Sequence, residues 1–224
     1  MRNLLLWSVL SFTMLVTPVL AAAAEPATEE QKTFYALGLM MSQSLSQFAL
    51  SEAELEMVKA GLTDGVLKRQ AKVELKQIMP KVKQLAESRA AVAAEAEKKA
   101  GAAYLVKAAG EKGATKTDSG LVITTIKPGK GNSPKKTDKV KVHYHGTLID
   151  GTVFDSSVQR GEPATFGLDG VIPCWTEGVQ KMKVGQKARL VCPAQLAYGD
   201  RGAPPTIKPG ATLVFEVELL DIVK

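Results

Sequence analysis

Side chains suited to metal binding are scarce in this chain of 224 residues, which contains 2 Cys and 2 His. A closed zinc site needs about four ligands, so all four of these side chains would have to converge to form one. His143 and His145 share one face of an expected strand, but two ligands make a poor site, and we interpret them as solvent-facing. We therefore predict neither a bound metal nor a cofactor.

A strong excess of one charge is also missing. The chain has 29 Lys+Arg against 23 Asp+Glu, a formal net charge of +6, without a long basic run. This weak bias does not predict binding to nucleic acid. A hydrophobic fraction of 45% is ordinary for a globular protein and excludes a wholly disordered chain.

Long apolar runs are confined to the beginning of the chain. Arg2 precedes an apolar stretch through Leu20, followed by four alanines that end at Ala24. This pattern predicts a signal peptide over residues 1–24, cleaved after Ala24, with an uncleaved membrane anchor as the alternative. The mature protein would have no membrane span and would reside in the periplasm or at the outer face of the envelope. Disulfides are permitted there, but the sequence leaves open whether Cys174 and Cys192 pair.

Residues 25–112 have the composition of an all-α domain with three helices. Ser51 and Glu54 form a capping-box pattern that starts the second helix. Because proline suits a first helical turn, Pro80 predicts that the third helix begins near Met79. Its narrow, alanine-rich apolar stripe indicates a long exposed connector. Such helices bury little alone, so we favour a homodimerisation domain, with docking onto the C-terminal half as the alternative.

Residues 113–224 change to strand-like runs separated by turns rich in Pro and Gly. The runs cover residues 121–126, 139–148, 187–192 and 212–222. A short helix is expected near 173–179, with Pro173 at its start. The fold class predicted for this half is therefore α+β, with a twisted antiparallel sheet wrapped around one short helix.

Motifs of nucleophilic, phosphate-binding and zinc-dependent catalysis are missing: we find no Gly-x-Ser-x-Gly, no Walker loop and no His-Glu-x-x-His. What the C-terminal half does hold is a set of aromatic residues beside one carboxylate, Asp155. Aromatic residues usually belong to the core. Here, however, the polar residues Asp155, Ser156 and Arg160 lie in the same segment as Phe154, and a strand buried in the core would not contain them.

Four separated blocks of this half resemble the FKBP-type peptidyl-prolyl isomerases. They are VHYHGTLIDGTVFDSS (142–157), GVIPCWTEG (170–178), AYG (197–199) and ATLVFEVELL (211–220). In the N-terminal half, FYALG (34–38) and the long helix resemble the dimerisation region of the exported macrophage-infectivity-potentiator type.

The resemblance implies rotation about X-Pro bonds in an apolar pocket that favours the twisted amide. The implied catalytic residues are Tyr144, Phe154, Asp155 and Tyr198. The implied substrate-binding residues are Arg160, Phe166, Val171, Ile172, Trp175, Ile207 and Phe215. Partners would be unfolded or proline-containing client proteins, a second copy of the chain and macrolide inhibitors. The alternative function is a holdase-type chaperone or binding module whose isomerase activity is incidental.

The sequence departs from the family at three places. Cys174 stands where the family usually has glycine, and Ala164 where an aromatic residue is common. The loop 202–210 lacks the usual Gly-Ile after its first proline. The resemblance implies that this loop overhangs the pocket, so the departure bears on substrate preference and macrolide affinity.

Overall fold

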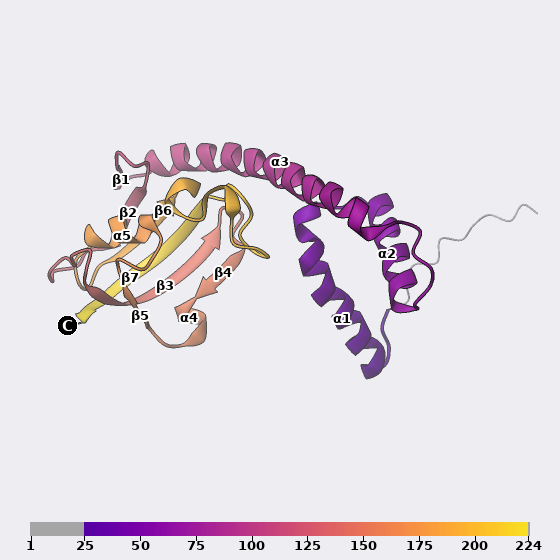
Figure 1. The fold of residues 1–224 in the computed structure, drawn as a ribbon. Helices are drawn as coiled ribbons and strands as arrows, with labels where there is room; N and C mark the ends of the chain where they lie inside the picture. Colours follow the sequence, from indigo (N-terminus) through magenta and orange to yellow (C-terminus); the bar gives the residue numbers. More distant parts are fainter. Residues whose placement is uncertain (1–24, 224) are drawn as a thin grey trace, which may run out of the picture. The chain divides into compact units, whose positions relative to one another are not determined.

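A computed structural model of the protein describes residues 25–223 (Figure 1). The chain divides into two compact units, one ending at Met41 and the other comprising Ser42–Lys224. The signal peptide expected in residues 1–24 lies outside the described residues. None of the helices within 25–223 combines the length and the apolar character needed to cross a membrane.

Helices fill the first part of the described chain, as predicted. Helix α1 (Glu29–Leu45) leads through a 3₁₀ turn, η1 (Ser46–Phe48), to α2 (Glu52–Val66). The capping box is confirmed: Glu54 N donates to Ser51 Oγ (3.4 Å), and Ser51 N donates to Glu54 Oε2 (2.8 Å). No residue of α1 or α2 is buried, so these helices present apolar side chains to solvent.

Helix α3 (Leu75–Ala109) is the longest element, and its predicted start near Met79 was wrong. The helix begins four residues earlier, after an extended N-cap at Glu74, and Pro80 lies inside it. Proline has no N–H to donate to the carbonyl of Lys76. Lys76 is exposed, so water can replace the missing donor, which explains why this end of the helix tolerates the proline.

A seven-stranded, fully antiparallel sheet forms the rest of the molecule. Its order is β1-β2-β6-β7-β3-β4, and β5 pairs with β3 (Figure 1). The strands are β1 Ala114–Lys116, β2 Val122–Lys127, β3 Lys139–Leu148, β4 Val153–Ser156, β5 Ala164–Gly167, β6 Lys187–Cys192 and β7 Leu213–Val223. The bounds of β3 and β6 are those predicted, and the fold class is confirmed. The strands β1, β4 and β5 and the short helix α4 (Ser157–Arg160) were not predicted, because three or four residues are too few to show a period.

The two faces of the sheet are covered by different helices. On one face, α5 (Pro173–Gln180) packs Trp175 and Val179 into the main core. On the other face, three valines lie side by side, because Val122 pairs with Val191 and Val191 with Val214. The end of α3 covers these valines with Ala108, which is 1% exposed. The alanine-rich end of α3 is therefore a packed element, where the sequence predicted an exposed connector; its small side chains permit the close approach.

Candidate active site

A cavity of about 270 Å³ opens between the sheet and α5. Its lining residues are Tyr144, Phe154, Asp155, Phe166, Gly170, Val171, Ile172, Trp175, Tyr198 and Phe215. Trp175 is 4% exposed, and its indole ring meets the rings of Tyr144, Phe166 and Phe215 edge to face at centroid distances of 5.3, 5.6 and 5.4 Å. Interlocked aromatic rings give the cavity a rigid apolar wall.

The antiparallel pairing of β3 with β4 and β7 positions these rings. Gly146 of β3 pairs with Asp155 on one side and with Phe215 on the other. A Cβ at Gly146 would lie 2.7 Å from Phe154 Cζ and 3.0 Å from Phe215 Cε1. Only glycine therefore leaves room for the edge-to-face contact of Phe154 with Phe215, whose centroids are 5.5 Å apart.

Asp155 is the charged group of the cavity, and two side chains hold it. The Tyr144 hydroxyl donates to Asp155 Oδ2 and the Arg160 guanidinium donates to Oδ1, while Arg160 also donates to the Tyr144 hydroxyl at 2.9 Å. Partial burial raises the pKa of Asp155, but the hydrogen bonds from Tyr144 and Arg160 and the charge of Arg160 outweigh it, so the net pKa lies below the usual value. The pKa of Tyr144 is raised, first by burial and then by its bond to Asp155. Asp155 is therefore a carboxylate at neutral pH and Tyr144 a neutral phenol.

The structure brings together nine of the eleven residues predicted from the sequence. Arg160 does not line the cavity but fixes Asp155, which does. Ile207 was expected as a cavity wall but is not among the lining residues; it is 6% exposed and packs in the same core as Trp175. Its backbone forms a bridge with Ala203 that folds the loop back on itself. Gly170 lines the cavity without having been predicted, and its only signal was its position beside Val171 and Ile172.

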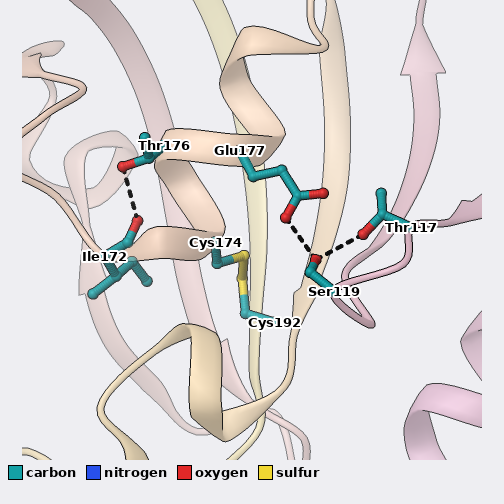
Figure 2. The surroundings of a disulfide bond; sticks show 7 residues. All are labelled: Thr117, Ser119, Ile172, Cys174, Thr176, Glu177 and Cys192. Carbon is teal, nitrogen blue, oxygen red and sulfur yellow. Dashed lines mark hydrogen bonds between the residues drawn. A yellow bond between two sulfur atoms is a disulfide. The ribbon is translucent and has the colours of Figure 1, made fainter. Parts of the chain in front are cut away.

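A disulfide joins Cys174 and Cys192, which the sequence had left open (Figure 2). Both cysteines are fully buried, and their Cα atoms are 5.7 Å apart, within the usual range for a disulfide. The bond ties the start of α5, one residue before Trp175, to the end of β6. Ser119 adds a second tie by donating to Glu177 Oε2 at 2.6 Å. Helix α5, which carries Trp175, is thus anchored at two points.

The two histidines lie on β3, where Nδ1 of His143 is 3.1 Å from Ser157 Oγ and Nδ1 of His145 is 3.0 Å from Ser156 Oγ. Glu218 and Glu216 pair with them across β7. Within residues 25–223 no group of three or more His, Cys, Asp and Glu side chains is arranged to hold a metal ion.

The lining of the cavity contains no serine, cysteine or histidine that could act as a nucleophile. An antiparallel sheet over one short helix, with a cavity of aromatic rings and one fixed carboxylate, defines a class of α+β domains with a concave, mostly apolar site, the usual form of a ligand-binding pocket.

Comparisons with known proteins agree with this class. Residues 130–220 match the family described as FKBP-type peptidyl-prolyl cis-trans isomerase, and residues 30–123 match the domain amino-terminal to it. An FKBP-type peptidyl-prolyl cis-trans isomerase FkpA of Aeromonas hydrophila is 44% identical over 92% of this chain and 81% of its own length. An FKBP-type 22 kDa isomerase of Escherichia coli is 43% identical over 87% of this chain and 96% of its own. The crystal structure of FkpA from Escherichia coli superimposes with a TM-score of 0.67 at 39% identity, covering 87% of this chain and 97% of that one.

The chain belongs to the FKBP-type peptidyl-prolyl cis-trans isomerases. Its activity is accordingly the interconversion of cis and trans X-Pro peptide bonds.

Proposed function

We propose that the protein is an exported isomerase that accelerates X-Pro rotation in envelope proteins by stabilising a twisted amide in the aromatic cavity. The main observation behind this mechanism is that one fixed carboxylate, Asp155, lies at the edge of a cavity lined by aromatic rings. Rotation about a peptide bond has a barrier of about 18–20 kcal/mol because the planar form is stabilised by resonance. No covalent bond breaks in this reaction, so the cavity needs no nucleophile.

An apolar cavity lowers the barrier because the twisted amide is less dipolar than the planar one. Leaving water therefore costs the twisted form less, and an apolar wall binds it in preference to the ground state. In our assignment Trp175 is the floor beneath the prolyl ring, and Phe154, Phe166 and Phe215 are the walls.

Polar groups at the edge would orient the peptide. We assign the backbone N–H of Ile172 and the hydroxyl of Tyr198 as donors to substrate carbonyls, and Val171 as an apolar contact beside them. Tyr198 lines the cavity and is 42% exposed, as a group that meets an incoming peptide must be. Asp155 would stabilise the twisted amide by its charge, without proton transfer. Macrolide inhibitors would occupy the same cavity.

Replacing Asp155 with asparagine tests the electrostatic part of this mechanism. Asp155→Asn removes the charge at nearly constant size, and we expect kcat/KM to fall roughly 10-fold, equivalent to about 1.4 kcal/mol. Because the pKa of Asp155 lies below the ordinary value of about 3.9, the wild-type rate should stay constant from about pH 8 to pH 5. It should decline only as the pH falls through that lowered pKa, where the carboxylate takes up a proton.

The measurement is a protease-free isomerisation assay of the chain from Glu25 with a short X-Pro peptide. The acid decline should be absent from Asp155→Asn, which has no carboxylate to protonate. Full activity of Asp155→Asn would remove the charge from the mechanism and leave shape alone. An inactive, folded wild type would refute the proposed function itself.

Export rests on the predicted signal peptide and is supported by the disulfide. Buried cysteine pairs persist as disulfides mainly in oxidising compartments, and Cys174 and Cys192 form such a pair. We accordingly place the mature protein in the periplasm or at the outer face of the envelope. The proposed division is residues 1–24 as signal peptide, 25–112 as helical domain with a connecting helix and 113–224 as isomerase domain.

The helical domain is proposed to dimerise and to hold clients. Its exposed apolar side chains include Phe34 (64%), Met40 (66%) and Met57 (73%), values that are unusual for a solvated helix surface. A second copy would cover this surface by packing helix against helix. Two isomerase domains on one dimer could then act on a large client, and under the alternative function the same surface would hold clients as a holdase.

The oligomeric state checks this proposal. We expect the chain from Glu25 to have twice the monomer mass by light scattering, and Phe34→Glu with Met41→Glu on α1 to yield a monomer, because buried charge is costly at an apolar interface. Ile126→Glu is the matched control, since Ile126 on β2 is 50% exposed and lies outside the helical domain. A wild-type monomer at micromolar concentration would contradict dimerisation.

A further inference from the structure

Two ion pairs connect α3 to the loop that follows Tyr198. We define the rim loop as residues 199–212 and the docking segment as residues 94–101 of α3. Lys98 Nζ lies 2.7 Å from Asp200 Oδ1, and Lys208 Nζ lies 3.3 Å from Glu97 Oε1. The pairs bind the loop near both of its ends. Exposed ion pairs contribute little by themselves, so the packing beneath them carries more of the contact.

That packing brings the backbone of each of two glycines close to the other segment. A Cβ at Gly210 would lie 2.5 Å from the carbonyl oxygen and 3.0 Å from Cα of Ala94. A Cβ at Gly101 would lie 3.0 Å from Cβ of Thr212. Ala94 is 4% and Thr212 3% exposed, so the seam between the helix and the loop is closed to solvent. A side chain at Gly210 would force the two backbones apart, and one at Gly101 would have to displace Thr212.

Backbone hydrogen bonds within the rim loop hold its shape, so a shift of α3 would move the loop as a unit and change the cavity. Gly210 N donates to Gly199 O at 2.9 Å and thereby closes the loop at its base. Gly202 N donates to Tyr198 O at 3.1 Å, which couples the loop to a lining residue of the cavity. A backbone pair between Ala203 and Ile207 anchors the far side of the loop in the core. Displacement of α3 would therefore shift Tyr198 as well.

We propose that the docking segment of α3 is a positioning element of the isomerase site, which sets where the Tyr198 hydroxyl meets the substrate. This inference rests on the proposed role of Tyr198 as a donor to the peptide. The same helix is tied to the helical domain at its other half, where Arg89 binds Glu54 Oε1 at 2.6 Å and the Ala49 carbonyl at 3.3 Å. One continuous helix thus connects α2 with the rim of the cavity.

A pair of helical glycines provides the test. Gly101→Leu forces α3 away from Thr212, whereas Gly61→Leu on α2 has open space around it, with nothing within 4 Å. Both changes replace glycine by a better helix former. For an X-Pro peptide we expect KM to rise 3- to 10-fold in Gly101→Leu with kcat nearly unchanged, and both constants to stay within twofold of the wild type in Gly61→Leu.

A double-mutant cycle with Tyr198→Phe separates positioning from general damage. If the docking segment acts through the Tyr198 hydroxyl, Gly101→Leu should change KM less than twofold once that hydroxyl is gone. An equal effect in both backgrounds would overturn the proposal. An inactive wild type would instead refute the proposed function.

Charge reversal keeps the test valid if Gly101→Leu does not fold. Lys98→Glu and Asp200→Lys each replace the attraction between the two side chains by repulsion, and we expect each to raise KM 2- to 3-fold. The double variant Lys98→Glu/Asp200→Lys restores the pair with reversed polarity and should return to the wild-type KM. Absence of this rescue would overturn the proposal. The control is the pair of Arg189 with Glu111, which lies outside the rim loop, and its reversal should leave KM unchanged.

Discussion

Phe154→Ala is expected to lower kcat/KM for X-Pro isomerisation by about 10- to 100-fold. The ring of Phe154 lines the cavity, and burying a phenylalanine-sized apolar surface is worth about 1.5–3 kcal/mol. Phe154 is only partly buried and packs on Phe215 at one edge, so its removal should open the cavity while the sheet stays folded. The measurement is the protease-free assay, combined with a thermal melt of the variant.

Ile126→Ala is the matched control for Phe154→Ala. Ile126 is an apolar residue of the same domain, 50% exposed and not part of the lining of the cavity, and its loss should leave kcat/KM within twofold. Phe154→Ala also separates the two functions. If aggregation of an unfolded client is still suppressed when isomerisation is lost, holding clients is independent of the cavity. Unchanged kcat/KM in Phe154→Ala would contradict the assignment of the active site.

Reduction of the Cys174–Cys192 disulfide is expected to lower the free energy of unfolding by about 3 kcal/mol. The two cysteines are 18 residues apart in the sequence. A bond that closes a loop of this length lowers the conformational entropy of the unfolded chain, and about 3 kcal/mol is the corresponding free energy. A change of this size corresponds to a decrease in Tm of roughly 10 °C. Thermal unfolding followed by circular dichroism, with and without reductant, measures it.

The double variant Cys174→Ala/Cys192→Ala is the control for the disulfide. Its Tm should be low in both conditions, because it loses the cross-link and some packing of two buried side chains and then has no bond to reduce. Equal Tm values for the oxidised and the reduced wild type would contradict a stabilising disulfide.

Much of the fold could be predicted from local sequence patterns. The bounds of β3 and β6 were predicted from strand-like runs that lie between turns rich in Pro and Gly, because such turns end a strand locally. The capping box at Ser51 was readable because its donors and acceptors lie within four residues. Lining residues from β3, β4, α5 and β7 were found by resemblance to a family, since no local pattern indicates that residues 70 positions apart share a cavity.

Other features depend on contacts between distant segments. The start of α3 was misjudged because the first-turn preference of proline is weaker than the context that lets the helix begin at Leu75. Ile207, which the sequence placed at the cavity wall, does not line the cavity in the structure, where its backbone pairs with Ala203 and it packs in the core.

The sequence by itself determined the helical half, the main strands, the aromatic set and Asp155 as its charged member, because periodicity, capping and residue chemistry are local properties. Only the tertiary structure decided that Cys174 meets Cys192, that Arg160 and Tyr144 converge on Asp155, and that the end of α3 packs on the sheet and the rim loop. Each of these contacts joins segments that are distant in the sequence. Strand register and the distance between the backbones decide which of them come into contact. Gly101 shows the difference: in the sequence it is an unfavourable residue within a helix, and in the structure it is the residue that lets α3 lie against Thr212.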